Sequence, residues 1–147
     1  MDKAFILSKI IDEYQKVVAN LKSSVERYKH ESDMDEDNTL DPDDYARQNE
    51  AKDMQLRFEK MLKEAKKNLK FIEDSKAESK QNIEAGTLIE TDGNYLFIGV
   101  SVPVFKIESK EVLSFSEDAP VFKTVKNKKI GDIFDIGKNK FEIINIF

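Results

Sequence analysis

The sequence of 147 residues contains no cysteine and only one histidine, His30. Without cysteine, the chain cannot form disulfide bonds, thiolate zinc sites or a cysteine nucleophile. A single histidine cannot supply a site with several histidine ligands, and its place near the end of a predicted helix favours a structural role. No self-sufficient nucleophile or acid–base pair stands out, so we expect that the protein is not an enzyme.

Long apolar runs are also absent. No stretch approaches the roughly 20 apolar residues that a membrane-spanning helix needs. The first residues, Met1 to Ala4, lead into a mixed apolar and charged pattern rather than a signal peptide with a basic start and an apolar centre. We therefore expect a cytoplasmic protein that does not bind membranes.

Charge is plentiful but unevenly distributed. Charged residues make up 36% of the chain, and the net charge is −5 at pH 7. The segment 31–44 contains eight acids and no base, so the rest of the chain carries a net charge of +3. An acidic chain without an obvious basic cluster is a poor candidate for direct, sequence-specific binding of nucleic acid.

Hydrophobic residues in the first half recur with the heptad spacing of coiled coils. Over 4–29, the stripe contains Leu7, Ile10, Tyr14, Val17, Leu21 and Tyr28, with Ile11, Val18 and Val25 beside it. Over 45–80, a second stripe contains Ala51, Met54, Phe58, Met61, Ala65, Leu69 and Ile72. Two such stripes predict a long antiparallel coiled-coil hairpin over 1–80, with the acidic segment 31–44 at its tip.

The composition changes after about residue 82. All five glycines and seven of the ten phenylalanines lie beyond this point. Short segments rich in β-formers, separated by turn signals, predict strands over 87–90, 95–102, 105–108, 112–115, 133–136 and 140–146. Pro120 opens one predicted short helix over about 119–127. The sequence thus predicts an α+β fold in which a small, mostly antiparallel sheet domain occupies 83–147.

Three stretches of this half, Ser114–Pro120, Lys128–Ile133 and Phe141–Ile146, carry recognisable motifs in a fixed order. A serine ends a strand, a small residue and a proline open a helix, a basic turn with Gly-Asp follows, and alternating aliphatic residues form a closing strand. Their order and spacing resemble the C-terminal domain of the Gre family of bacterial transcript-cleavage factors. The resemblance covers about the last 35 residues well and the preceding 30 loosely.

The resemblance implies a fold and a function. Gre factors have an N-terminal antiparallel coiled coil followed by a sheet domain like that of FK506-binding proteins. In that family the sheet domain binds RNA polymerase at the rim of its secondary channel, and the coiled coil enters the channel. Acidic residues at the tip then help to hold a second Mg²⁺, so that the polymerase cuts its own backtracked transcript. The chain would accordingly be a transcription elongation factor.

The tip is where the family pattern places the functional acids. That pattern, roughly Asp-x-x-Glu-Asn-x-x-Tyr, matches Asn38, Asp41, Pro42 and Tyr45 in this chain. The resemblance therefore implies that Asp41 is the critical residue; Asp37, Asp43 and Asp44 are expected to assist it. Because an amide stands in place of the first acid, stimulation of transcript cleavage and occlusion of the channel both stay open.

The acidic segment also fits the spacing of an EF-hand loop. Counted from Asp33, the ligand positions fall on Asp33, Asp35, Asp37, Thr39, Asp41 and Asp44. The sixth position is Asn38 instead of glycine, and the last ligand is shorter than the usual glutamate, which favours Mg²⁺ or weak Ca²⁺ binding. This predicts, as an alternative function, a Ca²⁺/Mg²⁺-binding adaptor.

Plainer interpretations remain for both charged regions. Acids near the start of the second helix stabilise its dipole, and a solvated acidic turn needs no ligand. The coiled coil would then be a passive interaction module. A basic patch near the predicted short helix serves either solubility or docking on the polymerase, and it consists of Lys123, Lys126, Lys128 and Lys129.

Overall fold

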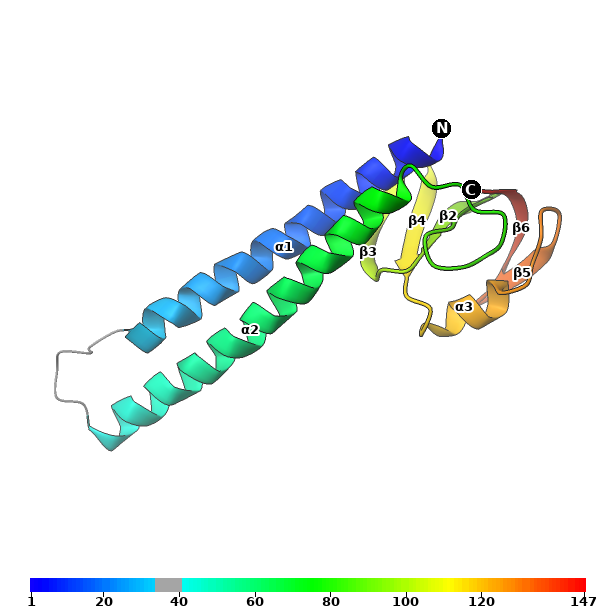
Figure 1. Ribbon diagram of the computed structural model, residues 1–147. Coiled ribbons are helices and arrows are strands. Elements are labelled where there is room, and N and C mark those ends of the chain that lie inside the picture. Colours follow the sequence, from blue (N-terminus) through cyan, green and yellow to red (C-terminus); the bar gives the residue numbers. More distant parts are fainter. Residues whose placement is uncertain (34–40) are drawn as a thin grey trace. The chain divides into compact units, whose positions relative to one another are not determined.

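The computed structural model describes residues 1–33 and 41–147. The fold is α+β, because two long N-terminal helices precede a curled six-stranded mixed sheet and a short helix (Figure 1). The chain divides into two compact units: Met1–Tyr14 with Leu69–Phe147, and Gln15–Asn68. Each long helix contributes residues to both units. None of the helices in the described ranges is long and apolar enough to cross a membrane.

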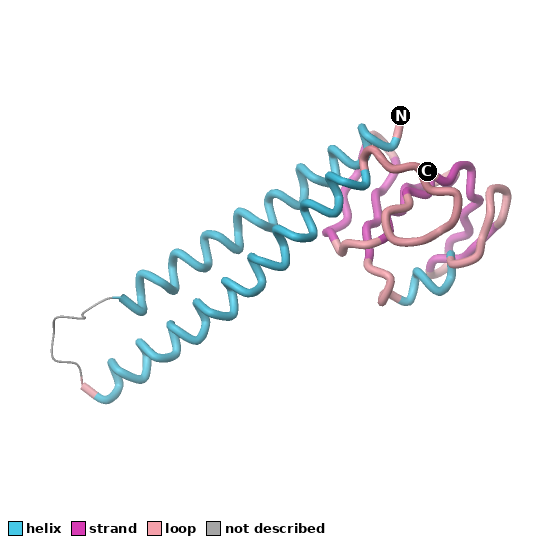
Figure 2. Tube along the Cα trace, viewed as in Figure 1, coloured by secondary structure: helices cyan, strands magenta, loops and turns pink. Residues whose placement is uncertain are grey.

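The two long helices are α1, Lys3–Asp33, and α2, Pro42–Ser75 (Figure 2). The first is longer than the predicted range of 4–29, and the second begins and ends earlier than the predicted range of 45–80. The early start of α2 has a local cause, because Asp41 accepts a hydrogen bond from the backbone N–H of Asp44 and Pro42 occupies the first helical turn.

The buried stripe of each helix is only partly the predicted one. In α1 the expected Leu7, Ile11, Tyr14, Val18 and Val25 are buried. In α2, Met61 is 52% exposed, so its assignment to the seam was wrong. Its neighbour Leu62 is half-buried instead. The seam of α2 runs in alternating steps of four and three through Ala51, Gln55, Phe58, Leu62, Ala65, Leu69 and Ile72.

Side-chain contacts show how the helices run within the unit Gln15–Asn68. Tyr28 stacks on Phe58 with ring centroids 5.5 Å apart. Four residues further along α1, Ser32 contacts Gln55, which precedes Phe58 in α2. Positions that rise along α1 therefore meet positions that fall along α2, and the helices are antiparallel in this unit.

The sheet has the strand order β3-β4-β2-β1-β6-β5. Its strands are β1 Leu88–Thr91, β2 Asn94–Ile98, β3 Val102–Ile107, β4 Lys110–Phe115, β5 Ile133–Ile136 and β6 Asn139–Ile146. Four neighbouring pairs are antiparallel, as expected, but β2 and β4 pair in parallel. The parallel pair arises because β3 takes the sheet edge and β4 returns between β3 and β2. The sheet is therefore mixed and, as predicted, mostly antiparallel.

The predicted strand over 95–102 is interrupted at Gly99. This residue has a φ of +135°, and its N–H donates to the carbonyl of Phe115 at 2.7 Å. A Cβ at this position would lie 2.5 Å from Cε1 of Phe71, on the last part of α2. Only glycine permits this backbone conformation together with this close approach. The end of α2 and the end of β2 consequently pack tightly within their common unit.

The short helix α3, Pro120–Val125, covers the core of the sheet. It begins with Pro120 in its first turn, as the sequence predicted, and ends two residues before the expected limit of 127. Phe122 and Val125 pack into a buried cluster with residues from the strands, including Ile89, Leu96 and Ile143. Burial of this apolar surface is the main stabilisation of the sheet unit.

Candidate functional site

Three of the predicted tip acids lie at the start of α2. Asp41 is the capping residue, and its Oδ1 accepts the N–H of Asp44 at 2.8 Å. Asp43 and Asp44 stand in the first turn of the helix, where negative charge is stabilised by the helix dipole. Asp41 and Asp43 are exposed, and Asp44 is half-buried. Tyr45, the matched tyrosine, is 53% exposed.

Asp44 also has a partner of its own. Its Oδ1 lies 2.9 Å from Nη2 of Arg47, one turn further along α2. The side chains of Asp44 and Arg47 are 39% and 77% exposed, so the pair contributes little to stability. Asp41 and Asp44 therefore have local structural roles, and Asp43 presents its carboxylate to solvent.

The remaining predicted residues divide between the end of α1 and a segment outside the described residues. Asp33 is the last residue of α1, and His30 lies in the last turn of that helix, as expected. Asp35, Asp37 and Thr39, together with Asn38, lie outside the described residues. Within 1–33 and 41–147, no group of three or more histidine, aspartate or glutamate side chains is arranged to hold a metal ion. The EF-hand interpretation stays a prediction.

A buried polar network lies close to these acids, and the sequence reasoning missed it. Ser32 Oγ lies 3.1 Å from Gln55 Oε1, and these residues are 7% and 5% exposed. Gln55 Nε2 donates to Glu59 at 2.9 Å, and Gln48 Nε2 donates to the carbonyl of Ser32 at 2.8 Å. The sequence could have indicated these buried positions, because Ser32 and Gln55 each continue the heptad spacing of their helix. They were passed over because only apolar residues were assigned to the seam.

Lysines on α2 form a second feature that the sequence reasoning did not recognise. Lys52, Lys60, Lys63 and Lys67 are exposed and, at helical spacing, fall on one face of α2. The chain thus contains a basic stripe that its overall acidity concealed. The predicted basic patch of the sheet unit is also at the surface: Lys123, Lys126 and Lys129 are exposed and Lys128 is half-buried.

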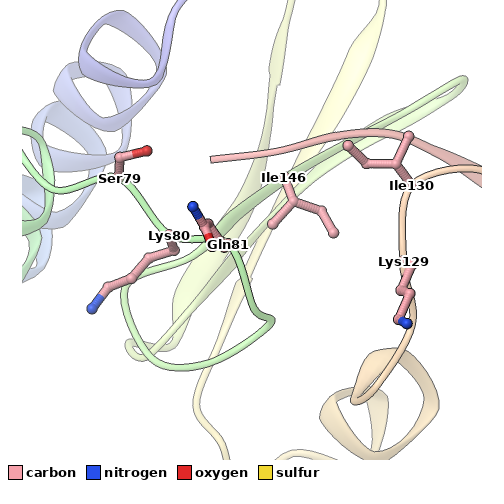
Figure 3. Close-up of a pocket in the computed structure, with 6 residues that line it drawn as sticks. All are labelled: Ser79, Lys80, Gln81, Lys129, Ile130 and Ile146. Atoms are coloured by element: carbon pink, nitrogen blue, oxygen red, sulfur yellow. The ribbon is translucent and has the colours of Figure 1, made fainter.

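A pocket of about 470 Å³ opens in the unit that contains the sheet (Figure 3). Ser79, Lys80 and Gln81 line it from the loop after α2, and Lys129, Ile130 and Ile146 line it from the region of β5 and β6. Lys80 Nζ lies 3.3 Å from Glu78 Oε2 and 3.6 Å from Glu84 Oε1. The hydrogen bond to Glu78 raises the pKa of Lys80. The two glutamates compensate its charge, and none of the predicted acids lines this pocket.

Comparison with known proteins gives no relative: no protein-family model, no curated protein and no solved structure matches the chain.

Proposed function

We propose that the chain is a Gre-like transcription factor that binds RNA polymerase and directs the acids at the start of α2 into the secondary channel. The two helices would act as one continuous coiled-coil hairpin, and the sheet unit would correspond to the FK506-binding-protein-like domain of that family. The protein would act in the cytoplasm, without catalysing a reaction itself. It would either stimulate transcript cleavage or regulate elongation by occupying the channel.

The observation that carries this proposal is the placement of the three C-terminal motifs on the fold. Ser114 lies near the end of β4, and Ala119 and Pro120 open α3. Gly131 and Asp132 form the turn that precedes β5, where the N–H of Gly131 donates to the carbonyl of Ile143 at 2.8 Å. Phe141–Ile146 lies in the closing strand β6. Each motif thus lies in the kind of element that the sequence predicted for it, and this agreement supports the proposal.

The helical part supports the same proposal. In the unit Gln15–Asn68 the helices are antiparallel, and the acids Asp41 and Asp43 stand exposed where α2 begins. At 1.5 Å per residue, the 34 residues of α2 extend over roughly 50 Å, enough to reach deep into a large enzyme. A long helical arm with solvated carboxylates at its end is suited to delivering negative charge to a site inside a partner.

The carboxylates at the start of α2 are better suited to a metal ion shared with the polymerase than to one bound by this chain alone. Carboxylates are suitable Mg²⁺ ligands, and Asp43 keeps its carboxylate exposed, whereas Asp41 and Asp44 use one oxygen each locally. Bound in the polymerase, a second Mg²⁺ would activate the water that attacks the transcript. On this proposal the residues of this chain contribute charge and position.

Transcript cleavage by backtracked elongation complexes tests the proposal. The purified protein is added to stalled complexes of polymerase from the same organism, and the RNA is separated on a gel. We expect short 3′ fragments with the natural chain and a loss of at least about tenfold in their rate with Asp41→Asn. Asparagine caps a helix about as well as aspartate, so this variant removes the charge and keeps the cap.

Two controls define the alternatives. Asp12→Asn changes an exposed acid in the N-terminal half of α1 and should leave the effect on transcript cleavage intact. Slowed elongation without cleavage, lost in Asp41→Asn, would identify a regulator that occupies the channel. No effect of the natural chain on either process would overturn the proposal. Micromolar binding of Ca²⁺ or Mg²⁺ by the isolated protein in a calorimetric titration would then favour the adaptor.

A further inference from the structure

The buried network around Ser32 and Gln55 is unusual for its position. Both residues lie in the hydrophobic seam. They stand between the aromatic pair Tyr28–Phe58 and the termini where α1 ends and α2 begins. Ser32 Oγ lies 3.0 Å from the carbonyl of Lys29 as well as 3.1 Å from Gln55 Oε1. Polar residues at such positions cost stability in a coiled coil, but they fix which residues of the two helices face each other.

The network disfavours alternative pairings of the helices. Apolar side chains in a seam tolerate one another, so a shift of α2 by one turn costs little where only such residues meet. Shifted by one turn, Gln55 would lose Ser32, its donor from α1, and face Tyr28, whereas its contacts within α2 to Lys52 and Glu59 would move with it. The loss of one such hydrogen bond costs about 0.5–1.5 kcal/mol. The observed pairing is therefore the one in which Gln55 has a partner on α1.

The network also joins the end of α1 to the beginning of α2. Ser32 is the penultimate residue of α1, and its carbonyl belongs to the last turn, which has no partner within the helix. Gln48, in the second turn of α2, donates to that carbonyl at 2.8 Å. The first turns of α2, which contain Asp43 and Asp44, are thereby held at a set height against α1.

We propose that Gln55, with Ser32 and Gln48, is a positioning residue that locks the helix register and so sets where the acids at the start of α2 stand. This inference rests on the proposed function, since its consequence is the placement of those acids. Gln55 contributes alignment and does not add to thermal stability. A displacement on the order of 1 Å is enough to reduce an active-site effect by up to about 100-fold.

The substitution Gln55→Leu separates alignment from stability. It leaves no buried polar group without a partner, because Ser32 Oγ still donates to the carbonyl of Lys29 and the exposed Glu59 turns to water. Leucine fits the seam, so we expect a melting temperature equal to or above that of the natural chain. We expect the effect on polymerase to fall at least about tenfold.

The register is measured directly by electron spin resonance. The chain contains no cysteine, so Lys29→Cys on α1 and Arg57→Cys on α2 introduce two spin labels at exposed positions of one unit. The natural background should give one narrow distance distribution. Gln55→Leu should broaden it or shift it by several ångströms, since one helical turn corresponds to about 5.4 Å. Gln15→Leu, an exposed position on α1, is the matched control for the added leucine.

The outcomes distinguish this inference from the proposed function. A changed distance, a retained melting temperature and a reduced effect on polymerase in Gln55→Leu alone would support it. An unchanged distance would overturn it, whether or not activity changes, and so would a changed distance with full activity. If the natural chain has no effect on polymerase, the proposed function fails, and the positioning of the acids for that function fails with it. The distance measurement still decides whether Gln55 fixes the register.

Discussion

Gly99 is the position where a single added methyl group should damage the sheet unit most. Its φ of +135° lies in a region that side chains rarely adopt, and a Cβ there would stand 2.5 Å from Cε1 and 2.9 Å from Cζ of Phe71. The ring of Phe71 cannot move freely, because it contacts the fully buried Phe97 with centroids 6.3 Å apart. Gly99→Ala therefore combines backbone strain with displacement of an aromatic ring that joins the end of α2 to β2.

The expected magnitude follows from these two costs. Backbone strain of this kind costs about 1–3 kcal/mol, and overpacking against the ring costs about 1–3 kcal/mol more. We expect Gly99→Ala to lower the free energy of unfolding by roughly 2–6 kcal/mol, a large part of the 5–15 kcal/mol typical of a domain. Urea denaturation followed by circular dichroism measures this change.

Gly137→Ala is the matched control. Gly137 has a φ of +61°, and a Cβ there would meet no atom within 4 Å, so only the backbone cost of about 1–2 kcal/mol applies. The two variants differ chiefly in the contact with Phe71. If they destabilise the protein equally, the close packing of Phe71 on Gly99 does not exist in solution, and the reasoning is refuted.

Two further predictions concern the helices. Leu62→Ala should lower the free energy of unfolding by about 1–3 kcal/mol, because Leu62 lies in the seam of α2. Met61→Ala should lower it by less than about 0.5 kcal/mol, because Met61 is exposed. Urea denaturation of both variants tests the corrected seam. Burial lowers the pKa of Lys3, whose Nζ donates to the carbonyl of Glu78. Between that lowered pKa and 10.5 the unfolded chain binds more protons, so stability should rise with pH there. Lys3→Met should remove this rise in unfolding free energies measured across the alkaline range.

Local signals explain most of what was predictable in the fold. The glycine turns and the helix start at Pro120 act within a few residues, so their effect can be read along the chain. The parallel pairing of β2 with β4 is different, because it depends on where β3 lies in the sheet. That choice is made by contacts between distant residues and leaves no periodic trace in either strand.

The seam of α2 shows why the candidate site was predicted less well than the fold. A search for apolar residues at heptad spacing selects Met54 and Met61 and passes over Gln55, which is 5% exposed. The seam of α2 is assigned correctly only if the polar residue Gln55 is accepted as one of its buried positions. Capping by Asp41 was missed for a related reason: its charge drew attention to metal binding, whereas the bond to the N–H of Asp44 requires only an acceptor.

The acids at the start of α2 have a structural role as well as the proposed functional one, and the size of the effects separates the two roles. Acids in the first turn stabilise the helix by about 0.3–1 kcal/mol each, and a neutral asparagine keeps the cap at Asp41. Replacing Asp41 or Asp43 by asparagine should therefore change stability by less than about 1 kcal/mol. On the proposed function, a tenfold fall in the effect on polymerase would correspond to about 1.4 kcal/mol of interaction that the isolated protein does not contain. Stability and activity of the same variants, measured side by side, thus assign each carboxylate to the helix or to a partner.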